Sequence, residues 1–356
     1  MARSRHPVLS DRVLNRTLLQ RQHLLERVDV APLAMVEHLL GLQAQDVLPP
    51  YLSLAARLTD PDPHPVSAAL ADRTAVRVLL MRGTLHLVTA DDALVLRPWV
   101  QPFLTASVRS ADFGRAFPAE EYDGLVAETG ALLAPGPLTG AELGERLAAT
   151  RPSLTASRAT ALAKTLAALA QLPPRGRWGL PGGQVYLPLA EWLERPPAEP
   201  EPGEIVRRWL RAYGPGSPAD VTTWSGVRGM REVFAGLGEE LVRYEDERGR
   251  TTYDLADLPL VDPATPAPVR LLGVYDNLWL SHSERTRVTT PEHRRAWMGL
   301  NGGTDATVFA DGMLAGLWRR TPGGGVDVRL LCDLTTTERS ELDDEVGRVE
   351  ALLRTP

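Results

Sequence analysis

An internal repeat, whose two copies start 78 positions apart, constrains the fold of this chain more than any other feature. Residues 136–143 and 214–221 each begin with Gly-Pro. In each copy a Thr or Ser comes next but one, and an acidic residue stands three positions after that hydroxyl residue. This spacing is typical of a capping box, in which a hydroxyl and a carboxylate close the first turn of a helix. Pro218 then occupies the first helical position, where a missing N–H is no loss. A repeat of this length indicates a domain-scale unit rather than a solenoid module.

Each copy continues with a further helix and then a hairpin, and the N-terminal region follows the same plan. Apolar spacing, capping signals and β-rich runs predict these elements. The predicted helices are 11–25, one from 32, 51–58, 66–71, 156–171 and 227–235. The predicted strand pairs are 76–81 with 84–89, 177–180 with 184–187, and 241–245 with 251–255. Short helices closed by a hairpin are the pattern of a winged helix-turn-helix, so we predict three tandem units.

From residue 269 onward the pattern changes to short strands and turns. The predicted strands 269–274, 278–281, 306–310, 312–319 and 326–331 indicate a small barrel or curled sheet, and a final helix spans 340–353. Prolines and glutamates interleaved at 196–202 form a linker. The fold class is therefore α+β, with winged-helix units at 8–108, 118–195 and 203–262 and a C-terminal β-rich, barrel-like domain at 268–356.

Charge and cysteine content limit the classes of partner and compartment. The net charge of −6 argues against a protein that coats nucleic acid nonspecifically, but residues 333–350 alone carry −5, so positive faces can exist elsewhere. The single cysteine, Cys332, excludes an internal disulfide and fits a reducing compartment; we expect it in a buried strand. The basic start of the chain has no apolar core after it, and no apolar run is long enough for a membrane span. We therefore expect a cytoplasmic protein.

Motifs for most common enzyme classes are missing from the sequence. The chain has no phosphate-binding Gly-rich loop, no dinucleotide fingerprint, no nucleophile elbow, no HExxH and no CxxC. Its seven histidines are scattered, and His282 and His293 lack a third ligand at metal spacing, so we expect no metal and no cofactor. Acid pairs such as Asp91-Asp92 fall at helix starts or on solvated faces, and we do not expect them to be catalytic.

A pair of glutamines around a small residue, Gln43-Ala44-Gln45, closes an apolar run just before Pro49-Pro50. Glutamine can hold and orient water but cannot act as a general base at neutral pH. In a helix the two amides would point to different sides, whereas in an extended strand they would share one face. The prolines favour an irregular helix end, where both amides could converge on one point. Considered alone, such glutamines are more often solvated at a helix end.

Several groups of residues, spread over nearly the whole chain, occur together in a fixed order. They are 41–46, Pro50-Tyr51, 81–86, 212–215 with Asp220 and 224–226, 271–277, and Asp311-Gly312 with 316–319. Together they resemble the winged-helix alkylpurine DNA glycosylases, a family that includes the azinomycin-resistance glycosylase and bacterial interstrand-crosslink glycosylases. The resemblance implies three tandem winged helices in a C-shaped scaffold, with a C-terminal β-rich domain. It also implies catalysis by a Gln-Φ-Gln motif, which Gln43-Ala44-Gln45 matches.

The same resemblance implies a monofunctional enzyme that hydrolyses the N-glycosidic bond of N3- or N7-alkylated purines, including bulky adducts or crosslinks. Such bases are cationic leaving groups, so two neutral amides that position water suffice. We expect Gln43 and Gln45 to be catalytic, with Asp46 at most an orienting group. Double-stranded DNA is the expected partner, and the expected protein is a monomer without a cofactor.

A hairpin and an arginine-rich face are the expected contacts to the duplex. The residues are Arg82, His86, Arg285, Arg287, Arg319 and Arg320. The histidine could equally be a satisfied strand residue, and each arginine could be a solvated surface group.

Two other functions stay open from the sequence. A non-catalytic winged-helix regulator would read DNA with a basic recognition helix. The candidate helix 156–171 is mostly Ala and Leu and offers only Arg158, Lys164 and Gln171, which weakens that interpretation. A small-molecule sequestering protein that confers drug resistance would need a large apolar pocket, which a sequence does not reveal.

Overall fold

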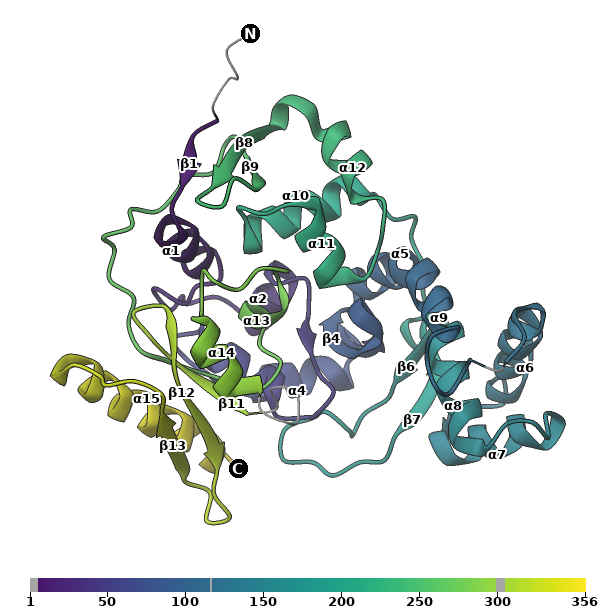
Figure 1. Ribbon diagram of the computed structural model, residues 1–356. Coiled ribbons are helices and arrows are strands. Elements are labelled where there is room, and N and C mark those ends of the chain that lie inside the picture. The colour runs from purple at the N-terminus through teal and green to yellow at the C-terminus, as the bar shows by residue number, and fades with distance from the viewer. Residues whose placement is uncertain (1–5, 116, 299–304) are drawn as a thin grey trace, which may run out of the picture.

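The structure is a computed structural model that describes residues 6–115, 117–298 and 305–356. It has a mixed α+β fold (Figure 1). The first region of the chain contains β1 (Val8–Leu9), α1 (Asp11–Arg21), α2 (Pro32–His38), β2 (Leu42–Gln43), α3 (Pro49–Ala55), α4 (His64–Ala71), β3 (Ala75–Leu79), the 3-10 turn η1 (Met81–Gly83), β4 (Leu85–Thr89) and α5 (Ala90–Val108). The four predicted helices and the hairpin at Arg82-Gly83 are confirmed.

The second and third regions contain the two copies of the repeat. The second has η2 (Ala119–Glu121), α6 (Tyr122–Leu133), β5 (Leu138–Thr139), α7 (Gly140–Thr150), α8 (Ala156–Leu166), β6 (Leu169–Gln171), β7 (Val185–Pro188) and α9 (Leu189–Leu193). The third has α10 (Pro202–Tyr213), α11 (Pro218–Ser225), α12 (Met230–Leu237), η3 (Gly238–Glu240), β8 (Leu241–Asp246) and β9 (Thr251–Leu255).

Both predicted capping boxes are present. Thr139 and Glu142 close the start of α7, and Ser217 and Asp220 close the start of α11. Each pair satisfies two backbone N–H groups that a helix start would otherwise leave without a partner. The local sequence therefore fixes where these two helices begin.

The hairpin predicted for the second region is wrong in its first strand. Helix α8 ends at Leu166, and β6, which the sequence pattern had joined to that helix, pairs with β7 instead. Residues 177–180 belong to a long connection between these strands that begins with Pro173-Pro174. The Arg177 N–H donates to the Pro174 carbonyl at 3.0 Å and the Leu180 N–H donates to the Arg177 carbonyl at 3.4 Å, so local turns occupy the groups that a strand would use.

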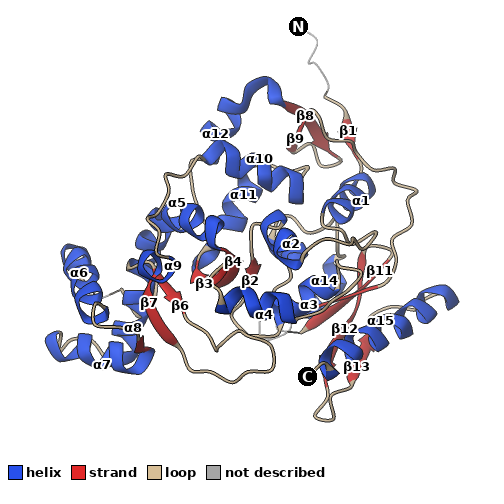
Figure 2. Ribbon diagram, turned by 180° about the vertical axis from the view of Figure 1, so that it is seen from behind, coloured by secondary structure: helices blue, strands red, loops and turns tan. Residues whose placement is uncertain are grey.

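One six-stranded sheet joins the first two regions, in the order β2-β4-β3-β6-β7-β5. The joining pair is β3 with β6, where Arg77 lies opposite Gln171. Seen from behind (Figure 2), β6 and β7 lie between the helices α6–α8 and the β3–β4 hairpin. A continuous sheet thus crosses the boundary between the predicted units 8–108 and 118–195. Strand β1 likewise pairs in parallel with β8 of the third region.

The C-terminal region contains β10 (Arg270–Leu272), α13 (Asn277–Leu280), α14 (Pro291–Met298), β11 (Ala306–Ala310), β12 (Met313–Arg320), β13 (Val326–Leu330) and α15 (Thr336–Arg354). Its strands form an antiparallel sheet in the order β10-β11-β12-β13, which stays open within the described residues, so the predicted barrel is not formed there. The strand predicted at 278–281 is helix α13, because the Asp276 side chain caps it by accepting from the Leu278 N–H. Cys332 is exposed after β13, not buried in a strand.

Hydrophobic packing groups these regions differently from their order in sequence. One large core contains residues from the first, third and C-terminal regions, including Leu39, Trp209, Trp224 and Trp279, and it extends to β6 and α9 of the second region. Helices α6–α8 have a separate core, and they project from one side of the molecule in Figure 1, away from α15. Among the described residues, no helix is long and apolar enough to cross a membrane.

Candidate active site

The Gln43-Ala44-Gln45 segment lies in extended backbone at the edge of the six-stranded sheet. Gly41, with φ of +99°, turns the chain out of α2 into β2, a conformation that favours glycine. Gln43 then pairs with His86 of β4, and the Ala44 N–H donates to the Leu85 carbonyl at 2.7 Å. The predicted irregular helix end is therefore wrong. Pairing with β4 satisfies the backbone polar groups here, which a frayed helix end would not do.

The Gln43 side chain is buried and held by Arg82, which lies in the turn of the hairpin. The Arg82 Nη2 donates to Gln43 Oε1 at 2.9 Å, and its Nη1 donates to the Trp224 carbonyl at the end of α11. Burial lowers the pKa of Arg82 to about 10. Its backbone adopts φ of +57°, which is unusual for a residue with a side chain and is often found at functional sites. Arg82 thus links the Gln43 amide to the end of α11 in this structure, and its contact with phosphate stays a prediction.

Gln45 is exposed, and its Oε1 accepts from the Leu85 N–H at 3.3 Å. Between the glutamines, Ala44 is buried, and its carbonyl accepts from Arg77 Nη2 at 2.6 Å. The oxygen of each amide thus has one donor, Arg82 for Gln43 and the Leu85 N–H for Gln45. Each oxygen keeps a second lone pair, and each NH₂ group keeps its donors. Each amide can therefore hydrogen-bond a water molecule.

A buried polar network fixes the turn that precedes the motif. Asn277 Nδ2 donates to the Gly41 carbonyl at 2.9 Å and to the Tyr213 hydroxyl at 2.9 Å. Next to Asn277, the Asp276 carboxylate accepts two hydrogen bonds from Arg57, both at 2.8 Å. Side chains from the first, third and C-terminal regions therefore converge behind the glutamines. The resemblance had pointed to residues 271–277 without saying what they do.

Two of the predicted nucleic-acid contacts are buried. His86 is 1% exposed, its Nδ1 lies 2.9 Å from the Thr84 carbonyl, and burial together with Arg82 lowers its pKa to about 3. Arg287 is also buried and donates to the Pro215 carbonyl at 3.0 Å. The structure gives both side chains protein partners, and contact of either one with DNA stays a prediction. A sequence pattern cannot separate a buried strand histidine from an exposed one.

The other predicted contacts lie at two places. Arg285 is partly buried and donates through Nε to the Trp279 carbonyl at 2.7 Å; it lies close enough to Arg82 to lower that residue's pKa. Arg319 and Arg320 are exposed at the end of β12, where Arg319 pairs with Asp327 at 2.9 Å. The structure does not join these two groups into one cluster around the glutamines.

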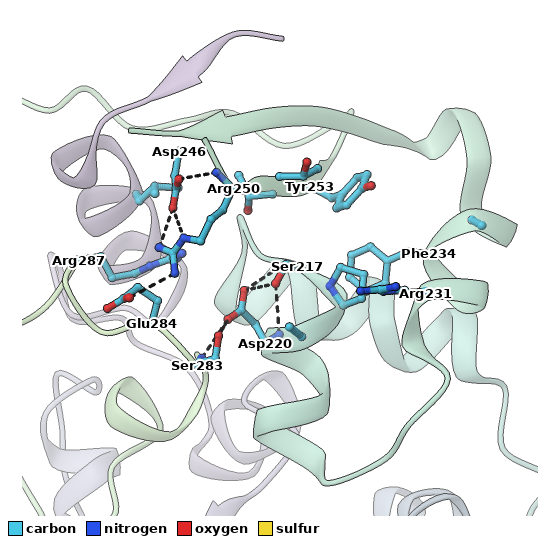
Figure 3. A pocket seen from close by; sticks show the side chains of 16 residues that line it. Ser217, Asp220, Arg231, Phe234, Asp246, Arg250, Tyr253, Ser283, Glu284 and Arg287 are labelled. Carbon is cyan, nitrogen blue, oxygen red and sulfur yellow. Dashed lines mark hydrogen bonds and ion pairs between the residues drawn. The ribbon is translucent and has the colours of Figure 1, made fainter. Parts of the chain in front are cut away.

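A cavity of about 520 Å³ that sequence reasoning missed lies between the third and C-terminal regions, beside α1 (Figure 3). Its polar groups bond mainly to one another: Asp220 accepts from Ser217 and Ser283, and Asp246 accepts from Arg250. None of the motif glutamines lines it. Within the part of the chain that the structure describes, no group of three or more His, Cys, Asp or Glu side chains could hold a metal ion.

Comparison with known proteins identifies the family. The model of the family described as DNA glycosylase AlkZ-like matches residues 36–352. An interstrand DNA cross-link repair glycosylase from Streptomyces sahachiroi is 28% identical over 328 residues, covering 84% of this chain and 85% of that protein. The solved structure of Streptomyces sahachiroi DNA glycosylase AlkZ matches with a TM-score of 0.81 and 26% identity, covering 98% of this chain and 99% of that one. The chain therefore belongs to the AlkZ-like DNA glycosylase family, which are hydrolases of N-glycosyl bonds.

Proposed function

We propose that this protein releases N3- or N7-alkylated purines from double-stranded DNA by directing a water molecule, held by Gln43 and Gln45, at the sugar C1′ atom. The observation that carries the proposal is that both amides of the motif are held by hydrogen bonds to the β3–β4 hairpin, Gln43 by Arg82 and Gln45 by the Leu85 N–H. Fixed dipoles aimed at developing charge lower a barrier without reorganising during the reaction. The protein acts as a monofunctional glycosylase and as a monomer in this proposal.

The chemistry of the substrate explains why neutral amides suffice. Alkylation at N3 or N7 makes the purine cationic, so its glycosidic bond breaks readily and leaves oxocarbenium character at C1′. The remaining task is to place a water molecule against that carbon, which is a matter of proximity and orientation. A glutamine oxygen can accept a hydrogen of this water, and a strong base is not required.

Bulky adducts and interstrand crosslinks are candidate substrates, since the Streptomyces sahachiroi relative is an interstrand DNA cross-link repair glycosylase. The three helix-and-hairpin regions support a further proposal, that 8–108, 118–195 and 203–262 are winged helices which curve around the duplex with the domain at 268–356. In this arrangement Arg285, Arg319 and Arg320 are the less buried candidates for phosphate contacts.

Release of N7-methylguanine from a duplex, compared with release of guanine from the same undamaged duplex, tests the substrate class. A second duplex, crosslinked through N7 of two guanines, tests whether larger lesions are accepted. We expect release from at least the methylated duplex and none from undamaged DNA. Release from neither damaged duplex would contradict the proposal.

Substitution of Arg82 tests its positioning role. We expect Arg82→Met to lower kcat about 10- to 100-fold with a smaller change in KM. A misplaced catalytic group reduces the stabilisation of the transition state more than it reduces DNA binding. Arg82→Lys should recover part of kcat, since an ammonium can reach Gln43 but cannot bond Trp224 at the same time. Arg109→Met, at an exposed arginine after α5, is the control. A rise in KM alone would show that Arg82 contacts DNA instead.

A further inference from the structure

A small polar cavity of about 70 Å³ lies beside Gln45, where the first and second regions meet. Its polar lining comes from separate elements: Gln45 after β2, Lys164 on α8, Gln171 on β6, Arg175 in the long connection, and Gln184 and Tyr186 at β7. The cavity is far smaller than the ~300–1,000 Å³ of sites for whole small molecules. It has room for one compact chemical group and a water molecule.

The charged side chains that line this cavity are both positive. Its lining includes two cations, Lys164 and Arg175, and no carboxylate, although the chain as a whole has a net charge of −6. Lys164 is the only lysine in the sequence, and its Nζ lies 5.8 Å from the centroid of the Tyr186 ring. Partial burial lowers its pKa. Arg175 Nη1 donates to the Gly182 carbonyl at 3.1 Å, which leaves its other N–H groups for a further acceptor.

A buried carbonyl oxygen at the same place lacks a donor. Gln171 is 4% exposed, and within the described residues its Oε1 has no hydrogen-bond partner. Its amide cannot simply turn over, because Nε2 donates to the Tyr186 hydroxyl at 3.3 Å, and that hydroxyl donates to Gln184 Oε1 at 2.9 Å. A buried acceptor without a donor is costly, so this oxygen points to a bound water or ligand.

We propose that this cavity binds one backbone phosphate of the DNA strand next to the lesion, between the Lys164 ammonium and the Arg175 guanidinium. A water molecule that donates one hydrogen to Gln171 Oε1 and the other to the phosphate completes the site. A phosphate fits because it is compact and anionic and its oxygens only accept hydrogen bonds. The two cations can donate to these oxygens, and the cavity lining has no carboxylate to repel them. The inference rests on the proposed function, because Gln45 lines the cavity. A phosphate bound there would fix the position of the lesion's C1′ atom relative to the Gln45 amide.

Salt dependence of binding measures the contact without relying on catalysis. For a duplex with N7-methylguanine, we expect Lys164→Met to weaken binding about tenfold. The negative slope of log association constant against log salt concentration should become shallower by ~0.9, the value for one lost phosphate contact. Lys164→Arg should keep the wild-type slope, because a guanidinium also binds phosphate. Arg158→Met, at an exposed position on the same helix, is the matched control. A wild-type slope for Lys164→Met, with the melting temperature unchanged, would overturn the assignment.

The single lysine allows a second test with amine-specific acetylation. We expect the methylated duplex to protect Lys164 from acetylation in wild-type protein, as read by mass spectrometry. Unprotected Lys164 in a saturated complex would contradict the site. A covalent adduct with abasic DNA after borohydride reduction, absent in Lys164→Arg, would also overturn it, because it would place the amine at C1′ and not at a phosphate. If wild-type protein releases no base but the slope and protection behave as expected, the proposed chemistry fails while the phosphate site stands.

Discussion

Gln43→Ala is expected to lower single-turnover release of N7-methylguanine about 100- to 1,000-fold, the usual effect of removing one preorganised polar group from a transition state. The substitution removes the amide whose Oε1 accepts a hydrogen bond from Arg82 Nη2 at 2.9 Å. It leaves the backbone pairing of residue 43 with His86 intact. DNA binding should change little, because Gln43 is buried and does not contribute a charge. The measurement is a single-turnover time course of base release with enzyme in excess.

Gln20→Ala is the matched control, since Gln20 is exposed on α1, far from the motif in sequence. Its rate of base release should equal that of the wild type. If Gln43→Ala also releases base at the wild-type rate while folded, then Gln43 does not hold the attacking water.

Arg57→Met is expected to lower the free energy of unfolding by about 3–5 kcal/mol, because it leaves a buried carboxylate without its cation. The Arg57 and Asp276 side chains are both fully buried, at 0% exposure, and two hydrogen bonds of 2.8 Å join them. Arg57 also donates to Gln22 Oε1 at 2.8 Å and to Ser53 Oγ at 2.9 Å. Urea unfolding followed by circular dichroism measures the loss.

The pH dependence of this loss has a definite sign. Burial alone would raise the Asp276 pKa, but Arg57 and the hydrogen bonds outweigh it, so the pKa lies below its ordinary value. The pair therefore stabilises the fold at neutral pH, and that stability is lost as the pH falls through the folded-state pKa. The difference between wild type and Arg57→Met should shrink in acid. The double variant Arg57→Met/Asp276→Leu should recover part of the loss at neutral pH. Equal stability of wild type and Arg57→Met at pH 7 would contradict this account.

Local signals in the sequence predicted the parts of the fold that local chemistry determines. The capping boxes at Thr139 and Ser217 and the hairpin at Arg82-Gly83 are short-range features, and the structure contains all three. Family resemblance predicted the enzyme class, because the motifs extend over nearly the whole chain, and membership of a glycosylase family decides against the non-catalytic regulator.

Contacts between distant residues were beyond the sequence pattern. Strand β6 reads as the end of an Ala- and Leu-rich helix, and only its pairing with β3 and β7 makes it a strand. The Arg57–Asp276 pair spans 219 positions, and no local pattern couples such residues. Arg82 was expected on phosphate, but its position in the hairpin turn directs it inward to Gln43. Burial, which decides these roles, depends on the whole fold.

The claim that Gln43 and Gln45 act on one water molecule is tested most directly by base release from N7-methylguanine duplex in a double-mutant cycle. The account predicts that Gln43→Ala/Gln45→Ala releases base at most a few-fold more slowly than the slower single variant. Two residues that hold the same water act as a unit, so removing the second adds little once the first is gone. All three variants should be slower than the wild type by about 100-fold or more. Release by the double variant at the wild-type rate would contradict the account and would place the active site elsewhere.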